Sequence, residues 1–303
     1  MSRGGVLLLA HGTPESLDDM PEYLTRVRGG RPPSPELVEE MRHNYAAIGG
    51  RSPLTDRTRA QAAALARALG GTPVFVGMRN WRPYVAEALA EARASGVEEL
   101  LALPLAPQYS SLSVAKYRDA VEAAGAGGLA VRFVESWHDH PGLLDGFAEK
   151  LTAALSAGPA DAVVFTAHSL PRRVIEAGDP YAGQVRATAE GVARRAGVAG
   201  WRLAWQSAGR TAEPWLEPTL EQELRAVAAA GARRVLVAPV GFVADHTEVL
   251  FDIDVQARAA AEALGLRLER TESLNDSPRF VAALADLVRA ARYDRPPATS
   301  TPA

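Results

Sequence analysis

The chain has 303 residues, of which 47% are apolar and 23% charged, with a net charge of −3 and no cysteine. This length favours two domains of roughly 100–150 residues each. The negative charge argues against nucleic acid as a partner, and the absence of cysteine excludes disulfides and cysteine-ligated zinc or iron–sulfur sites. Without a long apolar run or a signal-peptide pattern, we expect a cytoplasmic protein with no stable membrane association.

Short apolar runs that end near Gly or Pro alternate with longer stretches of helical periodicity. The expected strands are residues 5–10, 73–77, 99–105, 130–134, 162–167, 201–205, 234–240 and 266–270. The clearest helical stretches are residues 56–69, 84–95, 184–196 and 219–230. Alternation of this kind predicts an α/β fold in which helices cover both faces of parallel sheets.

The two halves of the chain resemble one another at three places, in the same order. The pairs are LLLAHGTP (7–14) with VVFTAHSLP (163–171), LLALPLAPQYSS (100–111) with VLVAPVGFVADH (235–246), and ESWHDHPGLLDGFAEKL (135–151) with ESLNDSPRFVAALADLV (272–288). One such likeness arises easily by chance, but three in order indicate a duplicated domain. The sequence therefore predicts two similar Rossmann-like domains.

We place the first domain at residues 1–150 and the second at 151–290, with the last helix packing back on the first domain. Residues 294–303 read as a disordered tail. The first domain carries an insertion at about 15–45, rich in Pro, Gly and Arg. It follows the first strand, at the sheet edge where open α/β sheets bind ligands; a surface loop without a ligand is the alternative.

Histidines follow the ends of three expected strands: His11, His168, and His246 with Glu248 close behind. If the two halves face each other, these strand ends converge on one cleft. Imidazole and carboxylate together suit divalent iron, zinc or cobalt, and they also remove protons near neutral pH. A purely structural role is the alternative for any one of these histidines.

The segment GFVADHTEVLFDID (241–254) has two interpretations. Asp245 followed by Glu248 fits a capping box, which would make the segment an ordinary helix start. A cap does not explain Asp252, which shares a helix face with Glu248 and would repel it if nothing lay between the two carboxylates. The segment is therefore also a candidate reactive site.

Several motifs, taken in order, resemble a known family. They are LLLAHGTP, IGGRSPLT (48–55), APQYSSLSVAKY (106–117), ESWHDHP (135–141), FTAHSLP (165–171), GDPYAGQV (178–185), AWQSAGRTAEPWLEP (204–218) and GFVADHTEVLFDID. From about residue 5 to 290 this set resembles ferrochelatase, which inserts ferrous iron into a porphyrin. The likeness is greatest to the short soluble bacterial form that acts on coproporphyrin III. It implies two Rossmann-like, chelatase-type domains around a porphyrin cleft.

The resemblance also implies roles for the residues of the site. His168 and Glu248 match the catalytic pair, and they form the expected metal-binding line together with Asp252. The next position of that line, usually Glu in the family, is Gln256 here. His11 stands where related bacterial forms often carry Tyr; its imidazole would either ligate product iron or pack against the ring.

Propionate contacts are implied for Arg28, Arg31, Ser52 and Tyr117. Arginines at the entrance of the cleft favour coproporphyrin III, with four propionates, over protoporphyrin IX, with two.

The expected product is iron-coproporphyrin (coproheme) in haem biosynthesis. The expected partners are the porphyrin and Fe(II), both substrates, with no organic cofactor, no iron–sulfur cluster and a monomeric state. A protoporphyrin IX ferrochelatase, a cobalt or nickel chelatase and a non-catalytic haem carrier are the alternatives.

Overall fold

Two parallel four-stranded sheets form the framework of the computed structural model, which describes residues 3–209 and 211–293. In spatial order, the first sheet contains β2 (Val74–Met78), β1 (Gly4–Ala10), β3 (Glu99–Pro104) and β4 (Ala130–Phe133), and the second contains β6 (Arg202–Gln206), β5 (Ala162–His168), β7 (Arg234–Ala238) and β8 (Arg267–Arg270). All eight expected strands are present, with ends within two residues of those expected. The α/β fold is confirmed, and the shared strand order supports the duplication.

The central strands β1, β3, β5 and β7 are buried on both faces and are almost continuously apolar, whereas the edge strands β4 and β8 carry charged and exposed residues. In β1, Val6 and Leu8 point to a central core, whereas Leu7 and Leu9 point to the opposite, outer core. β5 repeats this alternation, with Phe165 in the central core. The central core is one cluster that contains residues of both sheets, so the two halves share their main hydrophobic contact.

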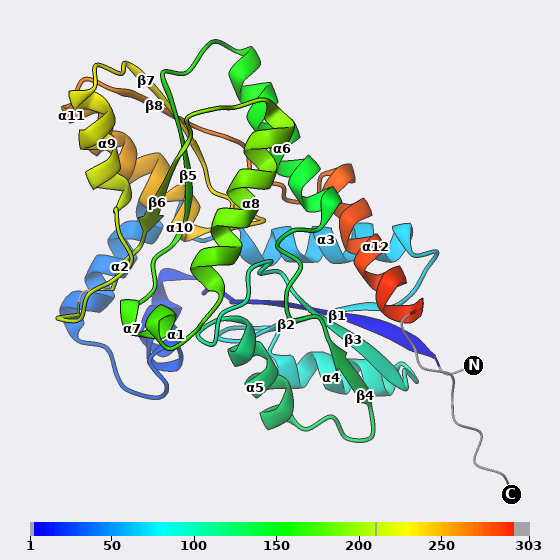
Figure 1. Ribbon diagram of the computed structural model, residues 1–303. Coiled ribbons are helices and arrows are strands. Elements are labelled where there is room, and N and C mark those ends of the chain that lie inside the picture. Colours follow the sequence, from blue (N-terminus) through cyan, green and yellow to red (C-terminus); the bar gives the residue numbers. More distant parts are fainter. Residues whose placement is uncertain (1–2, 210, 294–303) are drawn as a thin grey trace, which may run out of the picture.

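The helices lie on both faces of each sheet (Figure 1). The first half contains the 3₁₀-helix η1 (Leu17–Asp19), α1 (Met20–Val27), α2 (Pro35–Ala47), α3 (Leu54–Ala68), α4 (Val85–Ala94), α5 (Val114–Ala124) and α6 (Pro141–Ser156). The second contains α7 (Arg172–Glu176), α8 (Tyr181–Ala196), α9 (Leu220–Ala229), α10 (Thr247–Leu250), the π-helix η2 (Asp252–Ala257), α11 (Arg258–Ala263) and α12 (Pro278–Tyr293). α6 and α12 each begin with a proline, a residue suited to the first helical position.

The last helix of each half packs against the other half. α6 lies against α8, and α12 lies against both α3 and α6 (Figure 1). Arg289 of α12 also donates from Nη2 to the carbonyl of Ala68, at the end of α3, over 3.0 Å. The domain boundary expected at residue 150 lies inside α6, and the division into domains stays a prediction. The expected tail at 294–303 is outside the described residues.

The insertion at about 15–45 forms helices rather than an open loop. α1 and α2 follow β1 closely and pack on each other around Met20, Leu24 and Val38. Trp81, which follows β2, joins the same small cluster. The insertion is therefore attached to the carboxyl end of the first sheet by a core of its own.

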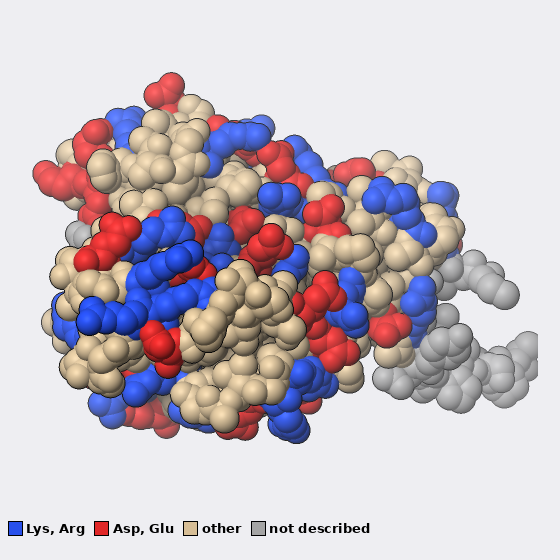
Figure 2. Space-filling model, turned by 90° about the horizontal axis from the view of Figure 1, so that it is seen from above, with Lys and Arg blue, Asp and Glu red and all other residues tan. Residues whose placement is uncertain are grey.

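Charges of both signs cover the surface. Viewed from above, acidic and basic side chains lie beside one another, with Lys and Arg gathered toward one side (Figure 2). Many are paired; Arg267, for example, lies 2.6 Å from Glu269. Such exposed pairs each contribute little to stability, at most about 1 kcal/mol. Within residues 3–209 and 211–293, no helix is both long and apolar enough to span a membrane.

Candidate active site

The candidate site lies at the carboxyl ends of the central strands. In each sheet the chain first adds a strand on one side of the initial strand and then crosses to its other side. The resulting switch points, between β1 and β3 and between β5 and β7, are where open α/β sheets bind ligands. His11 directly follows β1, His168 is the last residue of β5, and Glu248 lies on α10, after β7.

Glu248 lies between two imidazoles. Its Oε2 is 3.9 Å from His168 Nε2 and 3.9 Å from His246 Nε2. The Nδ1 atoms of both rings face backbone carbonyls: His168 that of Ser169, and His246 that of Ala244 at 2.9 Å. Because a carbonyl only accepts, each Nδ1 carries a proton in these bonds, and the Nε2 atoms of both rings face the Glu248 carboxylate.

The contacts of Glu248 with His168 and His246 favour a charged carboxylate and a basic imidazole. Burial acts to raise the pKa of Glu248, but the charges of His168 and His246 and a hydrogen bond from His246 hold it well below its usual range. Burial acts to lower the pKa of His246, but the hydrogen bond and charge of Glu248 outweigh it and raise that pKa. The site therefore holds an anion that attracts a cation, beside a nitrogen that accepts a proton.

Of the two interpretations of this segment, the capping box at Asp245 is wrong. His246 is the N-cap residue of α10, and Asp245 turns away from the helix end. Its carboxylate instead accepts hydrogen bonds from Ser273 Oγ at 2.7 Å and Asn275 Nδ2 at 2.8 Å. These partners lie about thirty positions further along the chain, so local spacing carried no signal of them.

Asp252 lies on the π-helix η2, where Gln256 N bonds to the carbonyl of Phe251, five residues back, over 2.9 Å. Such wide turns are rare and are found frequently at functional sites. Ser207 donates its hydroxyl to the Asp252 carboxylate, from a backbone position with φ of 60°. Burial and the charge of Glu248 raise the pKa of Asp252 to about 6, against the hydrogen bond from Ser207.

His11 faces this group from the other half of the molecule. Its ring contacts Asn80, with Nε2 3.1 Å from Asn80 Nδ2, and lies edge-on to Tyr23. Burial and the nearby Arg79 lower the pKa of His11 to about 4, although the Glu248 charge acts in the opposite direction. The charges of Glu248, His246 and His168 thus all act on the His11 ring, which supports the expected convergence of strand ends on one cleft, and that convergence stays a prediction.

The expected propionate contacts lie at different depths. Arg28 and Arg31 are exposed after α1, and Arg31 Nε donates to the Arg28 carbonyl at 3.3 Å. Ser52 is 3% exposed, and its Oγ accepts from Leu54 N at 3.4 Å, at the start of α3. Tyr117 is 6% exposed, and burial raises its pKa to about 12. Their porphyrin contacts stay predictions.

Sequence reasoning missed Arg79, Asn80 and Ser207. Arg79 lies over the Tyr117 ring at 5.7 Å from its centroid and also lowers the pKa of His11. Arg79 and Asn80 directly follow β2, and Ser207 directly follows β6. β2 and β6 occupy the same place in the two sheets, so the duplication marks both positions as neighbours of the site.

Among the described residues, no group of three or more His, Asp or Glu side chains could hold a metal ion. His168 and Glu248 lie close together, whereas Asp252 is bound by Ser207. Asp254, a further acid on the same helix, is bound by Arg270 and faces a different partner. The metal-binding role of His168, Glu248 and Asp252 stays a prediction.

The whole chain is similar to one known protein family. The Ferrochelatase family model matches residues 3–292, nearly the whole chain. The chain belongs to the ferrochelatase family. It is therefore an enzyme that inserts a metal ion into a porphyrin, as the motifs predicted, and the family places it in haem biosynthesis.

Relatives support the assignment to the ferrochelatase family across the full length. A ferrochelatase of Deinococcus radiodurans is 41% identical over 298 residues, which cover 94% of each chain. A coproporphyrin III ferrochelatase of Geobacillus thermodenitrificans is 38% identical, again over 94% of each chain. The sirohydrochlorin chelatase SirB of Bacillus subtilis superposes with a TM-score of 0.58 at 9% identity, covering 95% of this chain and 94% of that one. This last likeness supports the two-domain chelatase fold alone.

Proposed function

We propose that this ferrochelatase inserts Fe(II) into coproporphyrin III and releases iron-coproporphyrin. The observation that carries the chemistry is the Glu248 carboxylate, 3.9 Å from the Nε2 atoms of both His168 and His246. The ring must lose two pyrrole protons as Fe(II) enters. Neutral imidazoles accept protons near pH 7, and a carboxylate with a low pKa stays charged to attract the metal.

In this mechanism His168 and Glu248 share proton acceptance and first contact with the metal. Asp252 continues the acidic line toward solvent, and its pKa of about 6 lets it hold a proton or a cation near neutral pH. Gln256 is exposed on the same π-helix and is uncharged, so the outer end of that acidic line carries no carboxylate. Iron is a substrate throughout, and no organic cofactor or iron–sulfur cluster takes part.

The choice of coproporphyrin III rests on the polar groups of the first half. Arg28 and Arg31 expose two guanidinium groups on the segment after α1, and such forks bind carboxylates well. Ser52 and Tyr117 complete the proposed propionate contacts. The Geobacillus relative, at 38% identity, carries the name coproporphyrin III ferrochelatase, which adds support for the same substrate.

On the opposite side of the ring we place His11 next to the product iron. Its low pKa, about 4, keeps the imidazole neutral at physiological pH, which is the form that ligates iron. His11 therefore acts on the product rather than as a proton acceptor. We further propose that the enzyme works as a monomer in the cytoplasm, without stable attachment to a membrane.

The test is anaerobic insertion of Fe(II) into coproporphyrin III and protoporphyrin IX, followed by absorbance. We expect fast insertion into coproporphyrin III alone, lost in His168→Ala and kept in the exposed control Glu262→Gln. Equal or faster turnover of protoporphyrin IX would refute the substrate. Tight binding of porphyrin without insertion would indicate a carrier, and preference for Co(II) or Ni(II) would indicate a different chelatase.

A further inference from the structure

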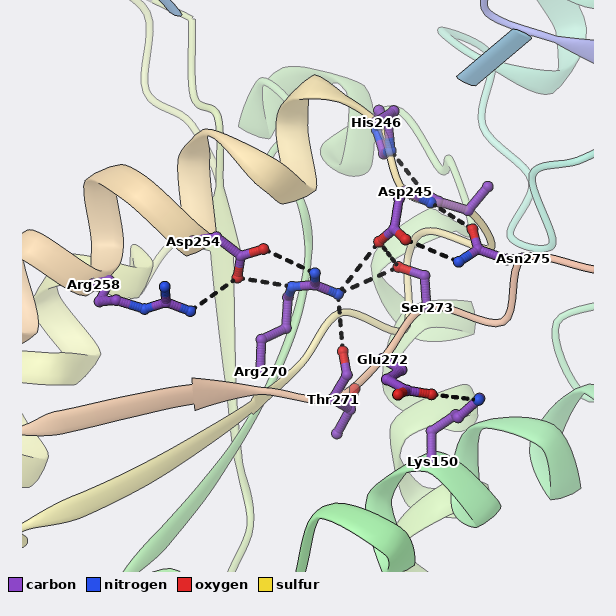
Figure 3. A network of polar contacts seen from close by, with 11 residues as sticks. Lys150, Asp245, His246, Asp254, Arg258, Arg270, Thr271, Glu272, Ser273 and Asn275 are labelled. Atoms are coloured by element: carbon purple, nitrogen blue, oxygen red, sulfur yellow. Dashed lines mark hydrogen bonds and ion pairs between the residues drawn. The ribbon is translucent and has the colours of Figure 1, made fainter. Parts of the chain in front are cut away.

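Arg270, the last residue of β8, joins two carboxylates that flank the candidate site (Figure 3). Its Nε and Nη2 donate to the two oxygens of Asp254, at 2.9 and 2.8 Å. On its other side, Nη1 lies 3.5 Å from Asp245 Oδ1 and donates to the Thr271 carbonyl at 2.9 Å. The side chain is only 12% exposed, so the contacts with protein oxygens replace those with water.

The Asp245 end of this bridge is fixed from several directions. Besides the bonds from Ser273 and Asn275 to its carboxylate, its own backbone N–H donates to Asn275 Oδ1 at 2.9 Å. Asn275 is tied in turn to the first half, because its carbonyl accepts from Gln61 Nε2 of α3 at 2.9 Å. Arg270 therefore connects the site segment to a frame that reaches across both halves.

Three residues assigned to the proposed site, His246, Glu248 and Asp252, lie between the two anchored acids in the chain. His246 and Glu248 follow Asp245, and Asp252 precedes Asp254 by two residues on η2. Asp252 and Asp254 have different partners, Ser207 for the first and Arg270 for the second. Because Arg270 holds both oxygens of Asp254, it opposes rotation of η2 about its axis, and rotation would carry Asp252 and Glu248 away from His168.

We propose that Arg270 is a positioning residue for metal insertion, which holds the segment from Asp245 to Asp254 so that Glu248 stays between His168 and His246. This inference rests on the proposed function, since it assigns Arg270 to the same reaction. Arg270 touches neither porphyrin nor iron in this role. A cavity of about 420 Å³ beside it is lined also by Arg57, Lys150 and Asp245.

The test compares Arg270→Gln and Arg270→Lys with a matched control on the same carboxylate. Arg258 also contacts Asp254 Oδ1, at 3.5 Å, and its side chain is 45% exposed. Arg258→Gln therefore removes an arginine from the same carboxylate but leaves the bonds between Arg270 and η2 in place. We expect kcat to fall at least about tenfold in Arg270→Gln and less in Arg270→Lys, which keeps the charge but not the fork. The control should stay within about twofold of the wild type. Porphyrin affinity, from quenching of porphyrin fluorescence, should also stay within twofold.

A readout besides activity separates this inference from the proposed function. We expect the backbone amide NMR signals of residues 246–254 to shift in Arg270→Gln, while those of β1, in the other half, stay as in the wild type. If the wild type inserts no iron, the proposed function fails, and these shifts still test the positioning. An unchanged kcat with unchanged amide signals in residues 246–254 would overturn the inference.

A second variant covers the case in which Arg270→Gln does not fold. Asp254→Asn weakens the same bridge from its other end and leaves no unpaired carboxylate on η2. We expect it to lower kcat in the same way, and combining it with Arg270→Gln should cost little more than either change alone. Additive losses, or a loss of kcat that only follows the loss of folded protein and porphyrin binding, would show a merely structural role.

Discussion

The two halves present the same strand ends to the site but give them opposite electrostatic character. After β1 and β2, His11 lies beside Arg79, and its ring is held neutral by burial and by that cation. After β5 and β7, a charged carboxylate lies between the imidazoles of His168 and His246. A duplicated fold thus supplies one face that repels protons and cations and one that attracts them. We infer that metal capture and proton removal belong to the second half.

The largest expected effect comes from removing the charge of the second half. Glu248→Gln should lower the rate of iron insertion at least about 100-fold, because it removes the anion that faces both imidazoles. His11→Gln should lower it by less than about threefold, because a neutral ring with a pKa near 4 accepts no proton in the reaction. Anaerobic absorbance assays on both proteins make the measurement. Equal losses would break the proposed division between the halves.

Asp252 offers a test through stability. Its pKa in the folded protein, about 6, lies above the ordinary value of 3.8, so ionisation is harder in the folded state. Its ionisation therefore makes the wild type lose stability as the pH rises from about 4 to 6. Asp252→Asn should gain stability relative to the wild type over that window. Urea unfolding at several pH values measures this, and a difference that does not change with pH would contradict it.

His246 should show the opposite pH dependence. Its pKa is raised in the folded protein because the attraction of Glu248 outweighs burial. A raised pKa stabilises the fold below the unfolded-state pKa, and this stability is lost as the pH rises through the folded-state value. The stability that the wild type has over His246→Gln should therefore shrink as the pH rises above the ordinary histidine pKa of about 6.5. Melting temperatures across this range, with His43→Gln as an exposed control, provide the measurement.

The smallest expected effect concerns the cation of the first half. Arg79→Met should raise the pKa of His11, because the second-largest cause of its low value is removed while burial remains. Loss of the contact with the Tyr117 ring should cost about 0.5–1 kcal/mol of folding free energy. NMR titration of His11 and chemical unfolding measure the two effects. A His11 titration that does not move would show that burial alone keeps the ring neutral.

Much of the fold and part of the site could be predicted from the sequence. The central strands are buried on both faces and almost continuously apolar, and their alternation with helices also located the more polar edge strands β4 and β8. The rule for strand ends brought His168 and Glu248 together in advance. The contacts of Asp245 could not be predicted, because Ser273 and Asn275 approach it only once β8 lies beside β7. The neutrality of His11 depends on its burial and on Arg79, about seventy positions further along the chain, so no local pattern records it. Arg270 was missed because an arginine at a strand end has no motif of its own.

The exchange of terminal helices has a consequence for building hybrid proteins. α6 belongs to the first half by sequence but packs on α8, and α12 belongs to the second half but packs on α3. A chain cut in the loop between α6 and β5 gives two fragments, each without a helix that covers its own sheet. A chimera that takes one half from a relative must therefore take the covering helix from the other half of that relative as well. The parts that can be exchanged as units are therefore sets of elements that pack together, not continuous halves of the chain.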